Sequence, residues 1–200
     1  MTMFCYQCEQ ASKGTGCTLS STCGKEENTA LAQDLLTCEI IGLAQAMADT
    51  GVEEPSAIDD MVDGLFATVT NVNFSVASVA TLADKLKNRR EKLGGKERMK
   101  PEALFRGDEN LVSLRSTLLF GLRGMAAYAH HARVLGKRKA EVDAWFIKGM
   151  AAVGREHSVE AWLSLLMELG GINLQCMAML DEAHTQAYGK PTPTQGAAAH

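Results

Sequence analysis

Four of the six cysteines fall within the first 23 residues, in the pattern Cys5-x2-Cys8-x8-Cys17-x5-Cys23. Thiolates bind zinc and iron–sulfur clusters, and pairs of thiols form disulfides. Residues 1–25 are also rich in Gly, Ser and Thr and show no apolar period, which is typical of a loop. The pattern therefore predicts a loop that is held by a metal or by disulfides rather than by a hydrophobic core.

The spacing of the cysteines discriminates among these chemistries. A structural four-cysteine zinc site usually has two tight Cys-x2-Cys turns, whereas five residues separate Cys17 from Cys23. Disulfides are disfavoured because the N-terminus has no secretory signal and the rest of the chain is long enough to build its own core. A cubane cluster is wider than one zinc ion, so its four ligands can come from a wide loop. The spacing favours an iron–sulfur cluster and leaves a structural zinc site as the alternative.

The residues between the cysteines suit a cluster as well as a flexible loop. Glycines let backbone N–H groups approach sulfur, hydroxyls add hydrogen bonds, and cations offset the negative charge of four thiolates. The glycines are Gly14, Gly16 and Gly24, the hydroxyl residues are Thr15, Thr18, Ser20, Ser21 and Thr22, and the cations are Lys13 and Lys25.

Other residues that could bind a metal or take part in redox chemistry are explained more simply by structural roles. Cys38 and Cys176 stand alone among apolar residues, as small buried side chains do. The pair at 130–131 is expected near the C-terminus of a helix, where a histidine cation is favoured by the helix dipole. Asp181, Glu182 and His184 lie within one helical turn and could bind a metal, but no fourth ligand is evident. No residue is singled out as catalytic.

The elements that must support the loop are predicted to be helices. Apolar residues recur at helical spacing from residue 26 to 95 and again from 111 to 195. Gly51 is a candidate helix C-cap, Ser75 and Ser158 open helices, and Gly170-Gly171 is expected to interrupt the last one. No convincing strand is present. We predict an all-α fold in which two three-helix bundles, 26–95 and 111–195, follow the loop 1–25 and are joined by a linker at 96–110.

The two helical sets resemble each other. Gly42-Leu43 matches Gly121-Leu122, Gly64 matches Gly149, and Ser75-Val76 matches Ser158-Val159. These matches hint at a duplicated three-helix unit, although helical amphipathicity alone produces some of them.

Composition excludes several classes of protein. The 200 residues are 46% hydrophobic and 22% charged, as in a folded globular protein, and the formal net charge is −4. A nucleic-acid-binding protein usually has an excess of basic residues, which this chain lacks. The sequence also contains no run of eighteen uninterrupted apolar residues, so it predicts no membrane span. We therefore expect a cytoplasmic protein with no nucleic-acid or membrane partner.

Several segments closely resemble hybrid cluster proteins, which are also called prismane proteins or hydroxylamine reductases. The resemblance lies in residues 3–10, 14–17 and 23–25, and it continues through 33–36, 64–68, 121–128 and 180–184. It implies that Cys5, Cys8, Cys17 and Cys23 are the ligands of one proximal cluster. The gaps resemble the [4Fe-4S] form of strict anaerobes, whereas wider gaps accompany [2Fe-2S].

The resemblance also implies an all-helical first domain and a role in electron transfer. In that family, electrons from an external donor protein reach a catalytic hybrid cluster held by two downstream α/β domains, which are missing here. We therefore expect an engineered or truncated N-terminal domain, with a naturally short paralogue as the alternative. We expect it to be inactive alone and to expose an apolar face through which it could dimerise. Residues 196–200 resemble a cloning or tag remainder and are excluded from the fold.

Overall fold

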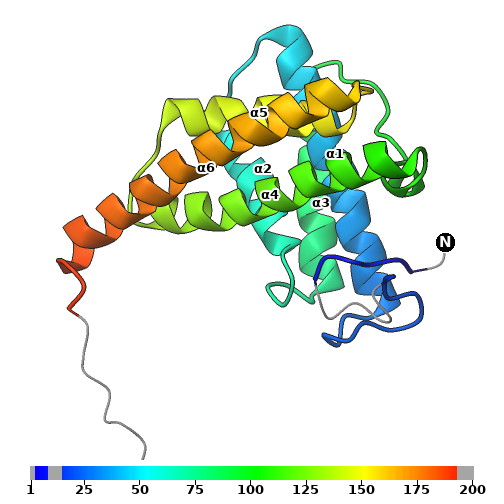
Figure 1. The fold of residues 1–200 in the computed structure, drawn as a ribbon, viewed down its shortest axis with the longest axis horizontal. Helices are drawn as coiled ribbons and strands as arrows, with labels where there is room; N and C mark the ends of the chain where they lie inside the picture. Colours follow the sequence, from blue (N-terminus) through cyan, green and yellow to red (C-terminus); the bar gives the residue numbers. More distant parts are fainter. Residues whose placement is uncertain (1–2, 9–14, 193–200) are drawn as a thin grey trace, which may run out of the picture.

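The computed structural model describes residues 3–8 and 15–192 and is built from helices (Figure 1). The elements are α1 (Glu27–Thr50), α2 (Pro55–Ala67), α3 (Val76–Lys92), the 3-10 helix η2 (Pro101–Phe105), α4 (Glu109–Val134), α5 (Ala140–Val153) and α6 (Val159–Tyr188). Within the described residues, β-structure is limited to one isolated bridge between Cys5 and Cys17. The prediction of an all-α fold is confirmed. The tail at 196–200, with Lys13 and Gly14 of the loop, lies outside the described residues.

Local side-chain chemistry sets the helix ends. Ser75 and Ser158 accept hydrogen bonds from the first-turn N–H groups of α3 and α6, as their positions predicted. Asp108 caps α4 in the same way. Gly51 ends α1 with a φ of 68°, in the left-handed region that favours glycine. The expected linker thus contains η2 and the capped start of α4.

The two sets of three helices share one hydrophobic core. Helices α1, α2 and α3 contact one another, as do α4, α5 and α6, and across the sets α1 packs on α5 and α2 on α4. Leu36 and Met61 of the first set and Phe146 and Trp162 of the second lie in the same buried cluster. Burial of this continuous apolar surface is the main force that holds the two sets together.

The predicted interruption at Gly170-Gly171 is wrong, because α6 is one continuous helix. Each glycine costs the helix about 0.5–1 kcal/mol relative to alanine. On either side of the pair, Leu169 and Cys176 are buried. We attribute the continuity to this packing, which outweighs the local propensity of two glycines.

Helix α6 is the longest of the described helices and contains a long apolar window. Its length and composition would allow it to cross a membrane, although core helices of water-soluble proteins often meet the same criterion. One face packs on α4, and the C-terminal turns project beyond the other helices (Figure 1). Only 22% of its most apolar 18-residue window is buried, so much of this helix is uncovered.

Candidate metal centre

The N-terminal segment and the loop after it lie against the end of the molecule where α1 begins (Figure 1). Cys5 and Cys17 exchange two backbone hydrogen bonds: the N–H of Cys5 lies 3.0 Å from the Cys17 carbonyl oxygen, and the reverse pair lies at 2.6 Å. Cys17 packs with Met3 and Ala30 in a small buried cluster that ties the loop to α1. The backbone thus brings two of the four predicted ligands side by side.

Gly16 is required at its position. Its φ of 133° is unfavourable for residues with a side chain, and a Cβ there would lie 2.7 Å from the ring of Phe4. The glycine therefore lets the Phe4 ring close over the backbone that pairs Cys5 with Cys17. The approach of a loop N–H group to sulfur, for which the sequence predicted these glycines, stays a prediction.

The second half of the loop forms a turn around Cys23. The Ser21 N–H donates to the Lys25 carbonyl at 3.2 Å, and the Gly24 N–H donates to the Ser21 carbonyl at 3.0 Å. The Thr22 hydroxyl oxygen lies 4.0 Å from the Cys17 sulfur. The Ser21 hydroxyl is buried with no hydrogen-bond partner among the described residues, so the loop holds an unsatisfied polar group of the kind that a bound group would engage.

The four thiols of the loop are chemically the kind of ligand that an iron–sulfur cluster uses. None of the six cysteines, all within the described part of the chain, forms a disulfide. In residues 3–8 and 15–192, no three His, Cys, Asp or Glu side chains converge closely enough to hold a metal ion. The structure therefore pairs Cys5 with Cys17, and it does not gather Cys8 and Cys23 with them around one point. Four thiols in one loop remain the donor type that such clusters use.

Two cations, one at the end of the loop and one in α4, are buried. Lys25 is 2% exposed, and its Nζ donates to the Gln33 Oε1 atom at 2.5 Å. Arg123 of α4 is 4% exposed and donates to the hydroxyls of Thr68 at 3.0 Å and Thr37 at 3.1 Å. Burial lowers the pKa of the Arg123 guanidinium, while the negative charges of Asp34 and Cys5 act in the opposite direction. The sequence pattern pointed to Lys25 as a cation near the thiolates, whereas nothing in it pointed to Arg123, which lies inside the resembling segment 121–128.

Asp34 is the buried carboxylate in this region. Burial raises its pKa from 3.8 to about 6, although the charges of Arg123 and Lys25 oppose that rise. No oppositely charged atom lies within 4 Å of it among the described residues. This region therefore combines three ionisable groups that are not in direct ion pairs.

Aromatic rings form a wall beside the cysteines. Phe4 and Tyr6 flank Cys5, and their ring centroids lie 5.4 Å from that of Phe105. Tyr6 also packs edge-on against Phe120, and its hydroxyl forms a hydrogen bond with Ser116. Burial raises the pKa of Tyr6. A cleft of about 620 Å³ runs along these rings.

The lone cysteines lie in the hydrophobic core, as predicted. Cys38 and Cys176 are fully buried. Burial raises the pKa of Cys38 to about 12 and that of Cys176 to about 11. Both thiols therefore stay protonated at neutral pH, which suits packing rather than ligation.

The histidines have structural contacts. His130 Nδ1 lies 2.9 Å from Asp63 and its ring stacks on Phe66 at 4.5 Å. His131 lies in the last turn of α4, as expected, and His184 packs edge-on against Tyr188.

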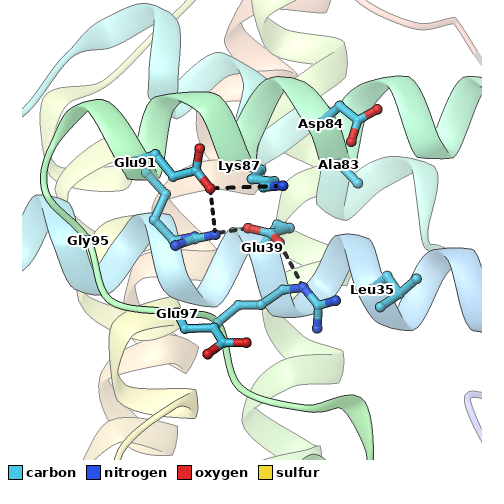
Figure 2. A pocket seen from close by; sticks show the side chains of 10 residues that line it. Leu35, Glu39, Ala83, Asp84, Lys87, Glu91, Gly95 and Glu97 are labelled. Atoms are coloured by element: carbon cyan, nitrogen blue, oxygen red, sulfur yellow. Dashed lines mark hydrogen bonds and ion pairs between the residues drawn. The ribbon is translucent and has the colours of Figure 1, made fainter.

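A second cavity, of about 600 Å³, lies between α1, α3 and the segment after α3 (Figure 2). The buried Glu39 carboxylate is 3.0 Å from Arg90 Nε and 2.8 Å from Arg98 Nε. Glu91 lies near Lys87 and Arg90 at the rim. These charges satisfy one another, so the network fastens this segment to α1.

Comparison with known proteins agrees with the resemblance in the sequence. The description of the family whose model matches residues 3–199 is Prismane/CO dehydrogenase family. Proteins named hydroxylamine reductase are similar: 37% identical in Nitratidesulfovibrio vulgaris, covering 96% of this chain, and 38% identical in Geobacter sulfurreducens, covering 98%. The protein of that name in Syntrophobacter fumaroxidans is 38% identical over 96% of the chain. The chain spans only 41–42% of the length of these relatives.

Proposed function

The chain belongs to the Prismane/CO dehydrogenase family, and from that premise we propose that it is the iron–sulfur electron-transfer domain of a hydroxylamine reductase. Proteins of this family carry iron–sulfur clusters. The observation that carries the proposal is the N-terminal loop, in which four thiols lie together in sequence and the backbone pairs Cys5 with Cys17.

Cys5, Cys8, Cys17 and Cys23 would hold one [4Fe-4S] cluster, which accepts and releases single electrons when bound. The chain's own residues have supporting roles. Gly16 allows the Phe4 ring to cover the paired backbone, and the packing of Cys17 against α1 anchors the loop. The Ser21 hydroxyl is available as a hydrogen-bond donor to a thiolate.

Reduction of hydroxylamine itself belongs, in this proposal, to the part of the relatives that the chain does not span. The chain would receive electrons from a donor protein and pass them to that part. Alone, it would not turn over hydroxylamine, because none of its residues is assigned a catalytic role.

Anaerobic purification followed by iron and sulfide analysis tests this function. We expect a brown protein with about four irons and four sulfides per chain and broad visible absorbance. Cys23→Ala should lose most of the iron, whereas the matched control Cys38→Ala should keep it, because Cys38 is a core thiol. A colourless wild-type protein with stoichiometric zinc would contradict the proposal.

A further inference from the structure

Most buried charged side chains in the described residues have an opposite charge close by. Glu39 lies 3.0 Å from Arg90, Asp60 lies 2.7 Å from Arg89, Asp143 lies 2.5 Å from Arg133, and Arg115 lies 3.2 Å from Glu156. Lys25, Asp34 and Arg123 are the buried exceptions, because no ion pair within 4 Å involves them in residues 3–8 and 15–192. Lys25 lies at the end of the cysteine loop, Asp34 in α1 and Arg123 in α4.

The partners of the two cations are neutral. The hydroxyls of Thr37 and Thr68 accept from Arg123 and donate to their own helix carbonyls, at 2.8 Å and 2.7 Å. Lys25 is held by the Gln33 amide, which is itself fixed by the Asn73 carbonyl at 2.8 Å. These contacts fix both cations in place without cancelling their charge.

The position of Arg123 connects it to the loop. Its guanidinium carbon lies 6.0 Å from the centre of the Phe120 ring, which packs on Tyr6, the neighbour of Cys5. Cys5 is also among the groups whose negative charge favours the charged form of Arg123 and so raises the Arg123 pKa. A buried guanidinium interacts with a neighbouring charge more strongly than an exposed one does, because the interior has a lower dielectric constant than water.

The buried charges in this region are unequal in number. Among the described residues, Lys25 and Arg123 are buried and positive, Asp34 is at most one buried negative charge, and the partly exposed Glu102 also acts on Asp34. A buried charge without compensation is costly, so buried ions are normally paired. A cluster held by four thiolates carries net negative charge and would add to the compensation of the two cations.

We propose that Arg123 is a positioning residue whose fixed charge offsets the negative charge of the loop thiolates. This charge raises the reduction potential of the cluster, and the second buried cation, Lys25, acts in the same direction. This inference rests on the proposed function. One-electron reduction, with the electron supplied by the donor protein, adds one negative charge to the cluster. A nearby buried cation stabilises the reduced form more than the oxidised form.

The test compares Arg123→Met and Arg123→Lys with Arg115→Met, which removes another buried arginine of α4 that has its own carboxylate partner. Each cluster-loaded chain is titrated anaerobically with dithionite while the reduced cluster is followed by electron paramagnetic resonance. We expect Arg123→Met to change the reduction equilibrium at least tenfold towards the oxidised form, which is 59 mV for one electron. Arg123→Lys and Arg115→Met should stay close to wild type.

The metal-free proteins are compared by urea unfolding, so that a change in potential is not confused with a loss of folding. A folded, loaded Arg123→Met protein with the wild-type potential would overturn the role of Arg123 alone. Wild-type protein that binds no iron and sulfide would overturn the proposed function, and this inference with it.

Discussion

Asp34 makes the stability of the metal-free protein depend on pH. The groups that act on it are Arg123 from α4, Lys25 from the loop and Glu102 from η2. Because burial raises its pKa from 3.8 to about 6, the folded state binds this proton more tightly than the unfolded state does. Its contribution to stability is therefore greatest below pH 4, declines as the pH rises to 6, and stays lost above that.

Asp34→Asn should remove this pH dependence. The rise in pKa to about 6 corresponds to roughly 3 kcal/mol, so the variant should exceed wild type by up to that amount in urea unfolding at pH 7.5. The difference should vanish near pH 4. Asp84→Asn, at an exposed position of α3, should show no such trend. A constant difference across this pH range would rule out titration of Asp34 as the cause.

The four candidate ligands could be predicted from sequence because they lie in one short segment with diagnostic gaps. Arg123 could not, since a lone cation on a helix is usually at the surface. Only packing shows that its guanidinium donates to the hydroxyls of Thr37 in α1 and of Thr68 at the C-terminal end of α2.

At the scale of helices, the repeated glycines occupy equivalent positions. A Cβ at Gly42 of α1 would meet Arg90 of α3, and one at Gly121 of α4 would meet Leu169 of α6. Gly64 of α2 likewise faces α1, as Gly149 of α5 faces α4. Each glycine lets two helices of its own set approach closely, which supports the duplicated three-helix unit suggested by the sequence.

Gly121→Ala and Gly124→Ala, both in α4, should have opposite effects. A methyl group at Gly121 would collide with Leu169, so this variant should lose about 1–3 kcal/mol of unfolding free energy. No atom lies within 4 Å of a Cβ at Gly124, so alanine there should gain about 0.5–1 kcal/mol from helix propensity. Urea unfolding measures both. Equal changes would mean that Gly121 does not set the α4–α6 distance.

The presence of helices and the residues that cap them were predictable, because the spacing of apolar residues and the identity of capping residues are features of the local sequence. Ser75, Ser158 and Gly51 act as expected. The continuity of α6 through Gly170-Gly171 was not predictable, since it depends on burial of Leu169 and Cys176. The shared core of the two sets likewise follows from cross-set packing of α1 on α5, which no local pattern encodes.

For the whole molecule, the most conspicuous feature is the uncovered apolar face of α6. Leu163, Met167 and Leu174 are 50%, 79% and 68% exposed, and their spacing places them on one stripe of the helix. Gly170 lies between them with no atom near its Cβ position. We propose that this stripe packs against the remainder of the polypeptide in the longer relatives, of which the chain spans only about two-fifths.

In the 200-residue chain, the same stripe should drive self-association. Large apolar patches left in water promote contact between copies. We expect the wild-type chain to elute above its 21.5 kDa monomer mass in size-exclusion chromatography with light scattering and to bind a hydrophobic dye. The double variant Met167→Glu, Leu174→Glu should be monomeric and bind less dye. Val134→Glu, at an exposed apolar residue outside the stripe, should behave as wild type. A strictly monomeric wild-type chain that binds no dye would show that this face is not an association surface.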